Sequence, residues 1–183
     1  MAHPFPRIEA AAIDGRLHTV YHRQVQLERL CKALITNVNE IKQAIEQDYT
    51  NTFEEIATEY HQTLTAVKQY YALLNPKEAH EEEYLVANGK DSPQARAPAG
   101  IVYIEPTTHT CFFSSIVPLA AALAAGNCVV LLVSTHFSTL YRSRSNRNAA
   151  PKQSTFAFRV TTKDSGVILG CGHLCHCFFA GQA

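Results

Sequence analysis

The 183-residue chain has no long apolar run and no excess charge of either sign. Its longest apolar stretch, residues 116–125, is much shorter than the ~20 residues that a membrane-spanning helix needs. The first residues contain no apolar segment typical of a secretory signal. We therefore expect a cytoplasmic protein with reduced cysteines and no membrane partner. A formal net charge of zero gives no indication of a nucleic-acid partner, and we assign none.

The charges are unevenly distributed along the chain. Residues 1–133 contain fifteen acidic and ten basic residues, whereas residues 134–183 contain one acidic and six basic residues. This change of sign indicates a boundary. We therefore divide the chain into a domain, residues 1–134, and a divergent tail, residues 135–183. The tail has few periodic apolar positions, so we expect it to be irregular and poorly ordered.

Apolar residues three and four positions apart predict two long amphipathic helical stretches in the first 75 residues. The first runs over residues 20–45, with a break near 35–36 and a restart at Asn37. The second begins at a capping box, Thr52 with Glu55, and Asn75-Pro76 ends it. We interpret the aromatic stripe of this second stretch as core and interface packing; it consists of Tyr60, Tyr70 and Tyr71.

The polar segment that follows contains turn residues at Asn88-Gly89. Its flanks, residues 83–87 and 94–97, are predicted to pair as a hairpin around that turn. A strand at residues 100–104, a helix within 112–125 and a strand at 128–133 come next.

These three elements form a parallel βαβ unit. Pro118 marks either a kink or a new first turn of the helix, and Gly126 suits the left-handed residue that ends it. The second strand is apolar throughout, which is typical of a strand buried on both faces. Ligands bind beyond the carboxyl ends of such strands, which predicts a site at the loops 105–111 and 134–136. The unit lacks G-x-G-x-x-G, so it has no dinucleotide fingerprint of its own.

Residues 97–134, APAGIVYIEPTTHTCFFSSIVPLAAALAAGNCVVLLVS, resemble the aldehyde dehydrogenase family. The most specific part is residues 122–127 with Val129-Val130, and the resemblance covers about residues 15–134. It implies an α/β fold: an N-terminal helical layer, a partial Rossmann-like βαβ unit and an irregular tail. The implied family reaction is oxidation of an aldehyde to a carboxylic acid with NAD or NADP.

The resemblance places few of the family's site residues in this chain. The oxyanion asparagine falls on His109, whose imidazole is able to donate a hydrogen bond. The cofactor-binding lysine falls on Leu132, and Ser134 is the one cofactor-binding candidate that agrees. The family's catalytic cysteine, general-base glutamate and glycine loop lie beyond the matching region and are not found in residues 135–183. We therefore assign no catalytic residue.

Several of these residues also have a simpler interpretation. His109 and Cys111 are typical of packing or solvent-edge positions. The chain ends in a cluster of cysteines and histidines: Cys171, His173, Cys175, His176 and Cys177. These residues lack the paired C-x₂-C spacing of zinc sites, so we assign no metal site.

An alternative origin for the tail is a shifted reading frame or a retained intron.

Two functions from different classes remain. The first is an aldehyde-oxidising enzyme of which this chain is an incomplete part, inactive alone. The second is a non-catalytic interaction subunit that docks on a full-length relative. The resemblance implies that the N-terminal helices and the hairpin contribute to dimer contacts, so we expect a homo- or hetero-oligomer through the N-terminal helices. Their apolar stripes agree with this, since exposed apolar patches often mark interfaces.

Overall fold

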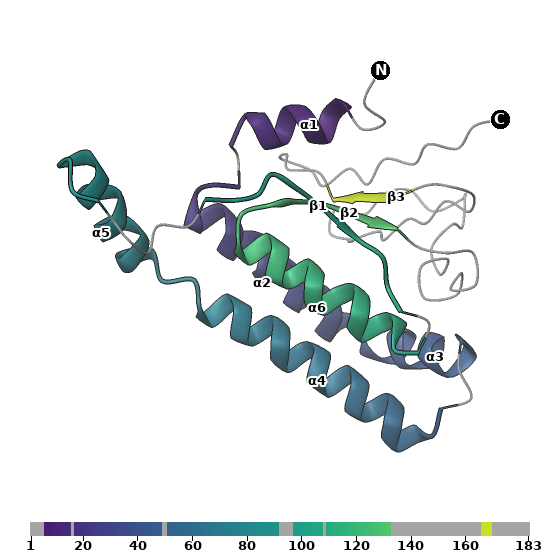
Figure 1. The fold of residues 1–183 in the computed structure, drawn as a ribbon. Coiled ribbons are helices and arrows are strands. Elements are labelled where there is room, and N and C mark those ends of the chain that lie inside the picture. Colours follow the sequence, from purple (N-terminus) through teal and green to yellow (C-terminus); the bar gives the residue numbers. More distant parts are fainter. Residues whose placement is uncertain are drawn as a thin grey trace, which may run out of the picture.

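The computed structural model describes residues 6–15, 17–48, 51–91, 97–107, 109–132 and 166–169. They form an α/β arrangement in which a small sheet is covered by helices (Figure 1). None of the helices in these ranges is both long enough and apolar enough to cross a membrane. The elements are α1 (Pro6–Ile13), α2 (Val20–Thr36), α3 (Val38–Asp48), α4 (Phe53–Ala72), α5 (Pro76–Ala87), β1 (Ile101–Ile104), α6 (Cys111–Ala124), β2 (Cys128–Leu132) and β3 (Gly166–Leu169).

The sheet has the order β1-β2-β3. Strands β1 and β2 are parallel, with Ile101 opposite Cys128, and α6 joins them, which confirms the predicted βαβ unit. Strand β3 pairs antiparallel with β2. Within the expected irregular tail, the structure thus describes one short strand, in which the apolar run at residues 167–169 pairs with β2 through backbone hydrogen bonds. The rest of the tail lies outside the described residues.

Both faces of β2 are covered. Val129 and Leu131 belong to the large core between the sheet and α6. Cys128 and Val130 face the other way and form a smaller cluster with Ile8 of α1. A strand buried on both faces was predicted from its unbroken apolar sequence, and this is confirmed. Helix α1, which covers the second face, was not predicted.

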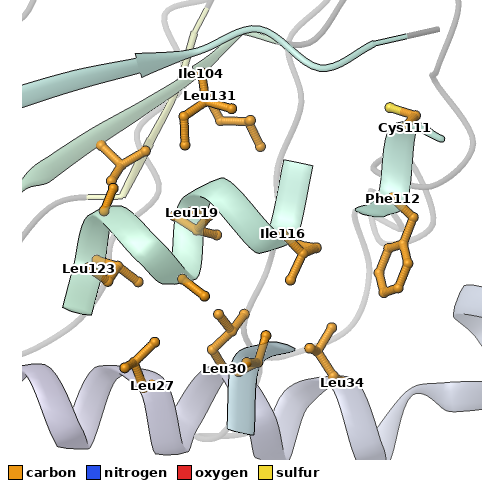
Figure 2. Close-up of a cluster of buried hydrophobic side chains, with 14 of the residues drawn as sticks. Leu27, Leu30, Leu34, Ile104, Cys111, Phe112, Ile116, Leu119, Leu123 and Leu131 are labelled. Atoms are coloured by element: carbon orange, nitrogen blue, oxygen red, sulfur yellow. The ribbon is translucent and has the colours of Figure 1, made fainter. Parts of the chain in front are cut away.

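The large core lies where α2, α4 and α6 meet under the sheet. On α2 the buried leucines fall three and four residues apart, which places them on one side of the helix. Figure 2 shows them facing the apolar side of α6, with Ile104 and Leu131 of the sheet on its other side. Full burial of each such side chain contributes about 1.5–3 kcal/mol. The facing residues are Leu27, Leu30 and Leu34 on α2 and Ile116, Leu119 and Leu123 on α6.

The predicted break in the first helical stretch lies at Asn37, between α2 and α3. The Asn37 side chain donates to the Ala33 carbonyl at 2.7 Å, and its own carbonyl accepts from the Ile41 N–H. The last carbonyls of a helix lack intrahelical donors. One of them, that of Leu34, accepts a hydrogen bond from the Tyr60 hydroxyl at 3.0 Å. Tyr60 is buried, which confirms the packing interpretation for this member of the aromatic stripe.

The predicted hairpin around Asn88-Gly89 is wrong, because residues 83–87 belong to α5. The sequence 75–78 starts a helix as well as ending one. Asn75 Oδ1 accepts from the Lys77 N–H at 3.1 Å, and its Nδ2 donates to Glu78 at 2.8 Å. Pro76, the first helical residue, needs no donor there. Helix α5 points away from the rest of the described chain (Figure 1).

Helix α6 is continuous through Pro118, so this proline does not begin a new helix. It is exposed, and its ring removes only one hydrogen bond of the helix. Both ends of α6 are held by side chains from other helices, and these ends position the candidate site.

Candidate functional site

The candidate site lies between the carboxyl end of β1 and the start of α6, in a loop of which the structure describes residues 105–107, 109 and 110. The Thr107 N–H donates to Ser114 Oγ at 3.1 Å, which fastens the loop to the first turns of α6. His109 lies in this loop and its side chain is exposed. The imidazole of His109, a hydrogen-bond donor, therefore faces solvent at the edge of the sheet where ligands of α/β proteins bind.

The first turn of α6 is capped by a residue of another helix. Thr110 occupies the N-cap position, but its side chain makes no capping hydrogen bond. Instead, the Phe113 N–H donates to the Glu59 carboxylate of α4 at 3.1 Å. Glu59 is buried, with 7% of its surface exposed. A carboxylate at this position also interacts favourably with the positive end of the helix dipole.

Burial raises the pKa of the Glu59 carboxyl, and the hydrogen bond from Phe113 opposes that rise. The neighbouring Tyr60 stacks on Phe112 with 6.2 Å between ring centroids and 6° between ring planes. Burial also raises the pKa of Tyr60, and the nearby Cys31 adds to the effect. Two consecutive residues of α4 thus hold two consecutive residues of α6.

The other end of α6 closes in a Schellman motif. Gly126 has φ 85°, its N–H donates to the Leu123 carbonyl, and the Asn127 N–H donates to the Ala122 carbonyl. A Cβ on Gly126 would lie 3.1 Å from the Leu17 carbonyl oxygen. Gly126 was predicted to end the helix in the left-handed conformation, and this is confirmed.

The residues around Gly126 tie the two parallel strands together. The Gly100 N–H, just before β1, donates to Asn127 Oδ1 at 3.0 Å, and the Cys128 N–H donates to the Gly100 carbonyl at 2.8 Å. Asn127 is buried. The Gly-Asn pair, part of the most specific stretch of the resemblance, therefore has a structural role in this chain.

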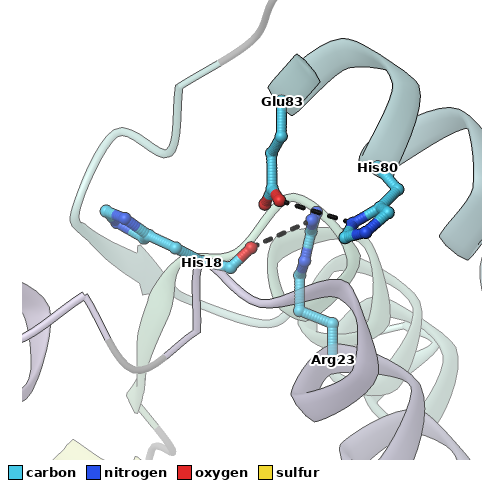
Figure 3. Close-up of polar contacts among 4 residues, drawn as sticks. All are labelled: His18, Arg23, His80 and Glu83. Carbon is cyan, nitrogen blue, oxygen red and sulfur yellow. Dashed lines mark hydrogen bonds and ion pairs between the residues drawn. The ribbon is translucent and has the colours of Figure 1, made fainter. Parts of the chain in front are cut away.

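Arg23 of α2 caps the last turn of α6. Its Nη1 donates to the Ala124 carbonyl at 2.8 Å, and its Nη2 donates to the His18 carbonyl at 3.2 Å. Figure 3 draws the second bond and, on α5, the exposed contact between His80 Nδ1 and Glu83 Oε2 at 3.6 Å. Burial lowers the pKa of Arg23 from its ordinary high value. A cation near the negative end of the dipole is favourable.

The structure separates the residues singled out in the sequence. Leu132 is the last residue of β2, at the same edge of the sheet as the loop that carries His109. Ser134 and the cysteine- and histidine-rich terminus lie outside the described residues. Cys111 is fully buried in the large core, which agrees with the packing interpretation. In the described part of the chain, no group of three or more His, Cys, Asp or Glu side chains is arranged to hold a metal ion.

Two charged residues that sequence reasoning missed, Glu59 and Arg23, hold the ends of α6. A signal for both was present. Glu59 follows Ile56 by three residues on the buried face of α4, and Arg23 follows Val20 by three on that of α2. A charged residue on an apolar stripe is seldom buried without a partner. Its presence there predicts a partner but does not identify it.

The comparison with known proteins decides the family. The sequence pattern of the aldehyde dehydrogenase family matches residues 9–140. The chain belongs to the aldehyde dehydrogenase family. Two curated relatives are both named aldehyde dehydrogenase family 3 member B1. The one from Bos taurus is 30% identical over 131 residues, and the one from Mus musculus is 30% identical over 130 residues.

These matches cover 68% of this chain and 27% of each relative. The chain thus spans about a quarter of the length of the curated relatives it matches. The family match contains α2, α4, the βαβ unit and the loop with His109. Aldehyde oxidation is the reaction of the family as a whole.

Proposed function

We propose that this chain supplies the helical layer and the oxyanion loop of an NAD(P)-dependent aldehyde-oxidising enzyme, and that it does not oxidise aldehydes by itself. The observation that carries the proposal is the β1–α6–β2 unit, with a polar loop at the carboxyl end of β1. In this proposal the unit is part of a Rossmann-like cofactor domain, and the loop is where charge on the aldehyde oxygen would be stabilised.

The chain's own residues fit only part of that chemistry. His109 is exposed in the loop, so its ring is able to donate to an oxyanion. For a nicotinamide cofactor the chain offers less than the family does, because Leu132, at the end of β2 where the family has a lysine, has no hydrogen-bond donor in its side chain. Cys111 is fully buried, so it is inaccessible to an aldehyde. Burial raises the pKa of the Cys128 thiol, which disfavours the nucleophilic thiolate.

An assay with the purified chain tests its inactivity. We expect no NADH or NADPH from a panel of aliphatic and aromatic aldehydes, at any level above a heat-killed control. Turnover that disappears when one cysteine is mutated would refute the proposal and identify the nucleophile.

A chimera tests the role of the loop. Residues 100–131 of this chain are placed in the bovine relative, and aldehyde oxidation is compared for His109, His109→Asn and His109→Ala. Loss of one oxyanion donor typically costs a factor of about 10²–10³ in kcat. We expect a factor of that order between His109→Asn, the most active chimera, and His109→Ala, the least active, with His109 itself between them. Equal activity of all three chimeras would show that the loop has no such role.

A second candidate, a non-catalytic interaction subunit, is favoured by exposed apolar residues around α5. Leu73, Tyr84 and Leu85 are all exposed, on or just before a helix that points away from the rest of the described chain. We expect the double variant Tyr84→Ser/Leu85→Ser to weaken association with a full-length relative in sedimentation velocity. Phe53→Ser, which changes another exposed apolar residue at the start of α4, is the control. Identical sedimentation of all mixtures would exclude this surface.

A further inference from the structure

The first turn of α6 is held by residues distant in sequence. In a helix the first N–H groups lack intrahelical partners, and an N-cap side chain ordinarily accepts from one of them. The Thr110 side chain does not do so, whereas Glu59, 54 residues earlier, accepts from Phe113. The position at which α6 begins therefore depends on α4.

The contact between α4 and α6 is specific in two ways. Glu59 provides an acceptor oxygen for the Phe113 N–H, and Tyr60 provides a ring that stacks on Phe112. Tyr60 itself is held by its hydrogen bond to the Leu34 carbonyl of α2. The acceptor is thus fixed on a helix that the large core already anchors.

The loop is in turn fastened to the turn that Glu59 caps. Ser114 follows Phe113 directly, and its hydroxyl accepts from the Thr107 N–H at 3.1 Å. The same hydroxyl lies 3.4 Å from the Cys111 carbonyl, to which it donates. If the first turn of α6 frays, the Ser114 hydroxyl moves and the Thr107 N–H loses the oxygen to which it donates.

We propose that Glu59 is a positioning residue for the described part of the loop, through the contact of Thr107 with Ser114. Its carboxylate oxygen accepts from the Phe113 N–H and so fixes the first turn of α6. Ser114 in that turn accepts from the Thr107 N–H, which in turn fixes the loop that carries His109. The proposal rests on the proposed function only for what the loop does, since the coupling from Glu59 to Thr107 is a property of this chain alone.

Amide hydrogen exchange on the full chain, followed residue by residue by NMR, tests the coupling. The variant Glu59→Leu removes the oxygen that accepts from the Phe113 N–H and approximately retains the volume of the side chain. We expect the Phe113 and Thr107 amides to exchange about fivefold faster relative to the Leu30 amide of α2, since one hydrogen bond contributes about 1 kcal/mol. Glu59→Gln keeps an acceptor oxygen, and its ratios should stay within about twofold of the wild type.

Thr63→Val is the matched control. Thr63 is a buried polar residue of α4, and its hydroxyl donates to the Glu59 carbonyl within the same helix. Its loss lowers global stability and should accelerate Phe113, Thr107 and Leu30 together. Unchanged ratios in Glu59→Leu, or ratios in Glu59→Gln equal to those of Glu59→Leu, would overturn the proposal.

Two further variants keep the test open if Glu59→Leu does not fold. Glu59→Asp retains the charge but withdraws the oxygen by one methylene, and it should accelerate the same two amides. Ser114→Ala should accelerate Thr107 and leave Phe113 unchanged, and acceleration of neither amide would count against the coupling. Aldehyde turnover by the chain would refute the proposed inactivity without altering these exchange ratios, so the two failures are distinguishable.

Discussion

The two ends of α6 differ in how they relate to the family pattern. The carboxyl end, with Gly126 and Asn127, matches the most specific part of the pattern, and its residues close the helix and join the strands. The amino end follows the loop that carries His109, which the sequence resemblance aligns with the family's asparagine, and its cap comes from Glu59. The carboxyl end is thus closed by residues next to it in the sequence, whereas the amino end, beside the candidate loop, depends on a residue of another helix.

The largest effect is expected at the matching end, from Gly126→Ala. A residue with a Cβ at φ 85° is strained, and the new atom would lie 3.1 Å from the Leu17 carbonyl oxygen. We expect a loss of about 2–3 kcal/mol in the free energy of unfolding, measured with urea. Gly89→Ala has φ 68° but open space around the new Cβ, so it should cost only about 1 kcal/mol. Equal losses would show that the contact with Leu17 contributes nothing.

A smaller loss is expected from Arg23→Met, which keeps the apolar stem and removes the cap of α6. Two hydrogen bonds from Arg23 to carbonyls stabilise the fold. The burial of Arg23 Nε, which has no hydrogen-bond partner within the described residues, offsets part of that stabilisation. The net loss should be about 1 kcal/mol. Arg29→Met, an exposed residue of the same helix, is the control, and unfolding in urea measures both. A gain in stability would mean that the orphaned Nε costs more than the cap contributes.

At the departing end the effect depends on pH. Because burial raises the pKa of Glu59 in the folded chain, the folded state holds this proton more tightly than the unfolded state. The stability linked to protonation is complete below the unfolded pKa and is lost as the pH rises through the folded pKa. We therefore expect the free energy of unfolding of Glu59→Gln to increase relative to the wild type as the pH rises above the ordinary glutamate pKa of about 4.3.

Urea unfolding at several pH values measures this difference. Glu54→Gln, an exposed residue at the start of α4, controls for the loss of one carboxylate from the same helix. A difference between Glu59→Gln and the wild type that falls as the pH rises would contradict the expected sign.

The smallest effect is expected from His109→Asn in the chain alone. The residue is exposed, so the free energy of unfolding should change by less than about 0.5 kcal/mol. Aldehyde oxidation should remain absent, because we assign no catalytic cysteine to this chain, and without a nucleophile an oxyanion donor has no adduct to stabilise. Thermal unfolding and the aldehyde assay together check this. Aldehyde oxidation gained by this single substitution would show that the chain holds a nucleophile after all.

Local signals in the sequence predicted the parts of the fold that depend on neighbouring residues. The capping box of Thr52 and Glu55 forms as expected, and Gly126 ends α6 as expected. The hairpin failed because Asn88-Gly89 follows a helix here, and the start signal of Asn75, Pro76 and Glu78 was interpreted only as a stop. Turn residues fix a local bend, and they do not decide whether a strand or a helix precedes it.

The partners of Glu59 and Arg23 were beyond prediction for a different reason. Each charge lies on an apolar stripe, which shows that it needs a partner, but that partner is a backbone group 54 or 101 residues away. Every buried helix end has backbone groups of this kind, and the sequence does not indicate which helix end will supply the partner. The position of His109 followed from the strand that precedes it, whereas the means by which its loop is held required the packing of α4 on α6.

The caps of α6 also bear on the order in which the chain is made. Arg23 and Glu59 precede α6 in the sequence, so a ribosome completes α2 and α4 before the helix whose ends they hold. Contacts between residues so far apart form slowly, because a long loop must close first. We therefore expect α6 to leave the ribosome as an uncapped apolar segment. Until its end caps form, its apolar side chains depend on the already synthesised α2 and α4 for burial.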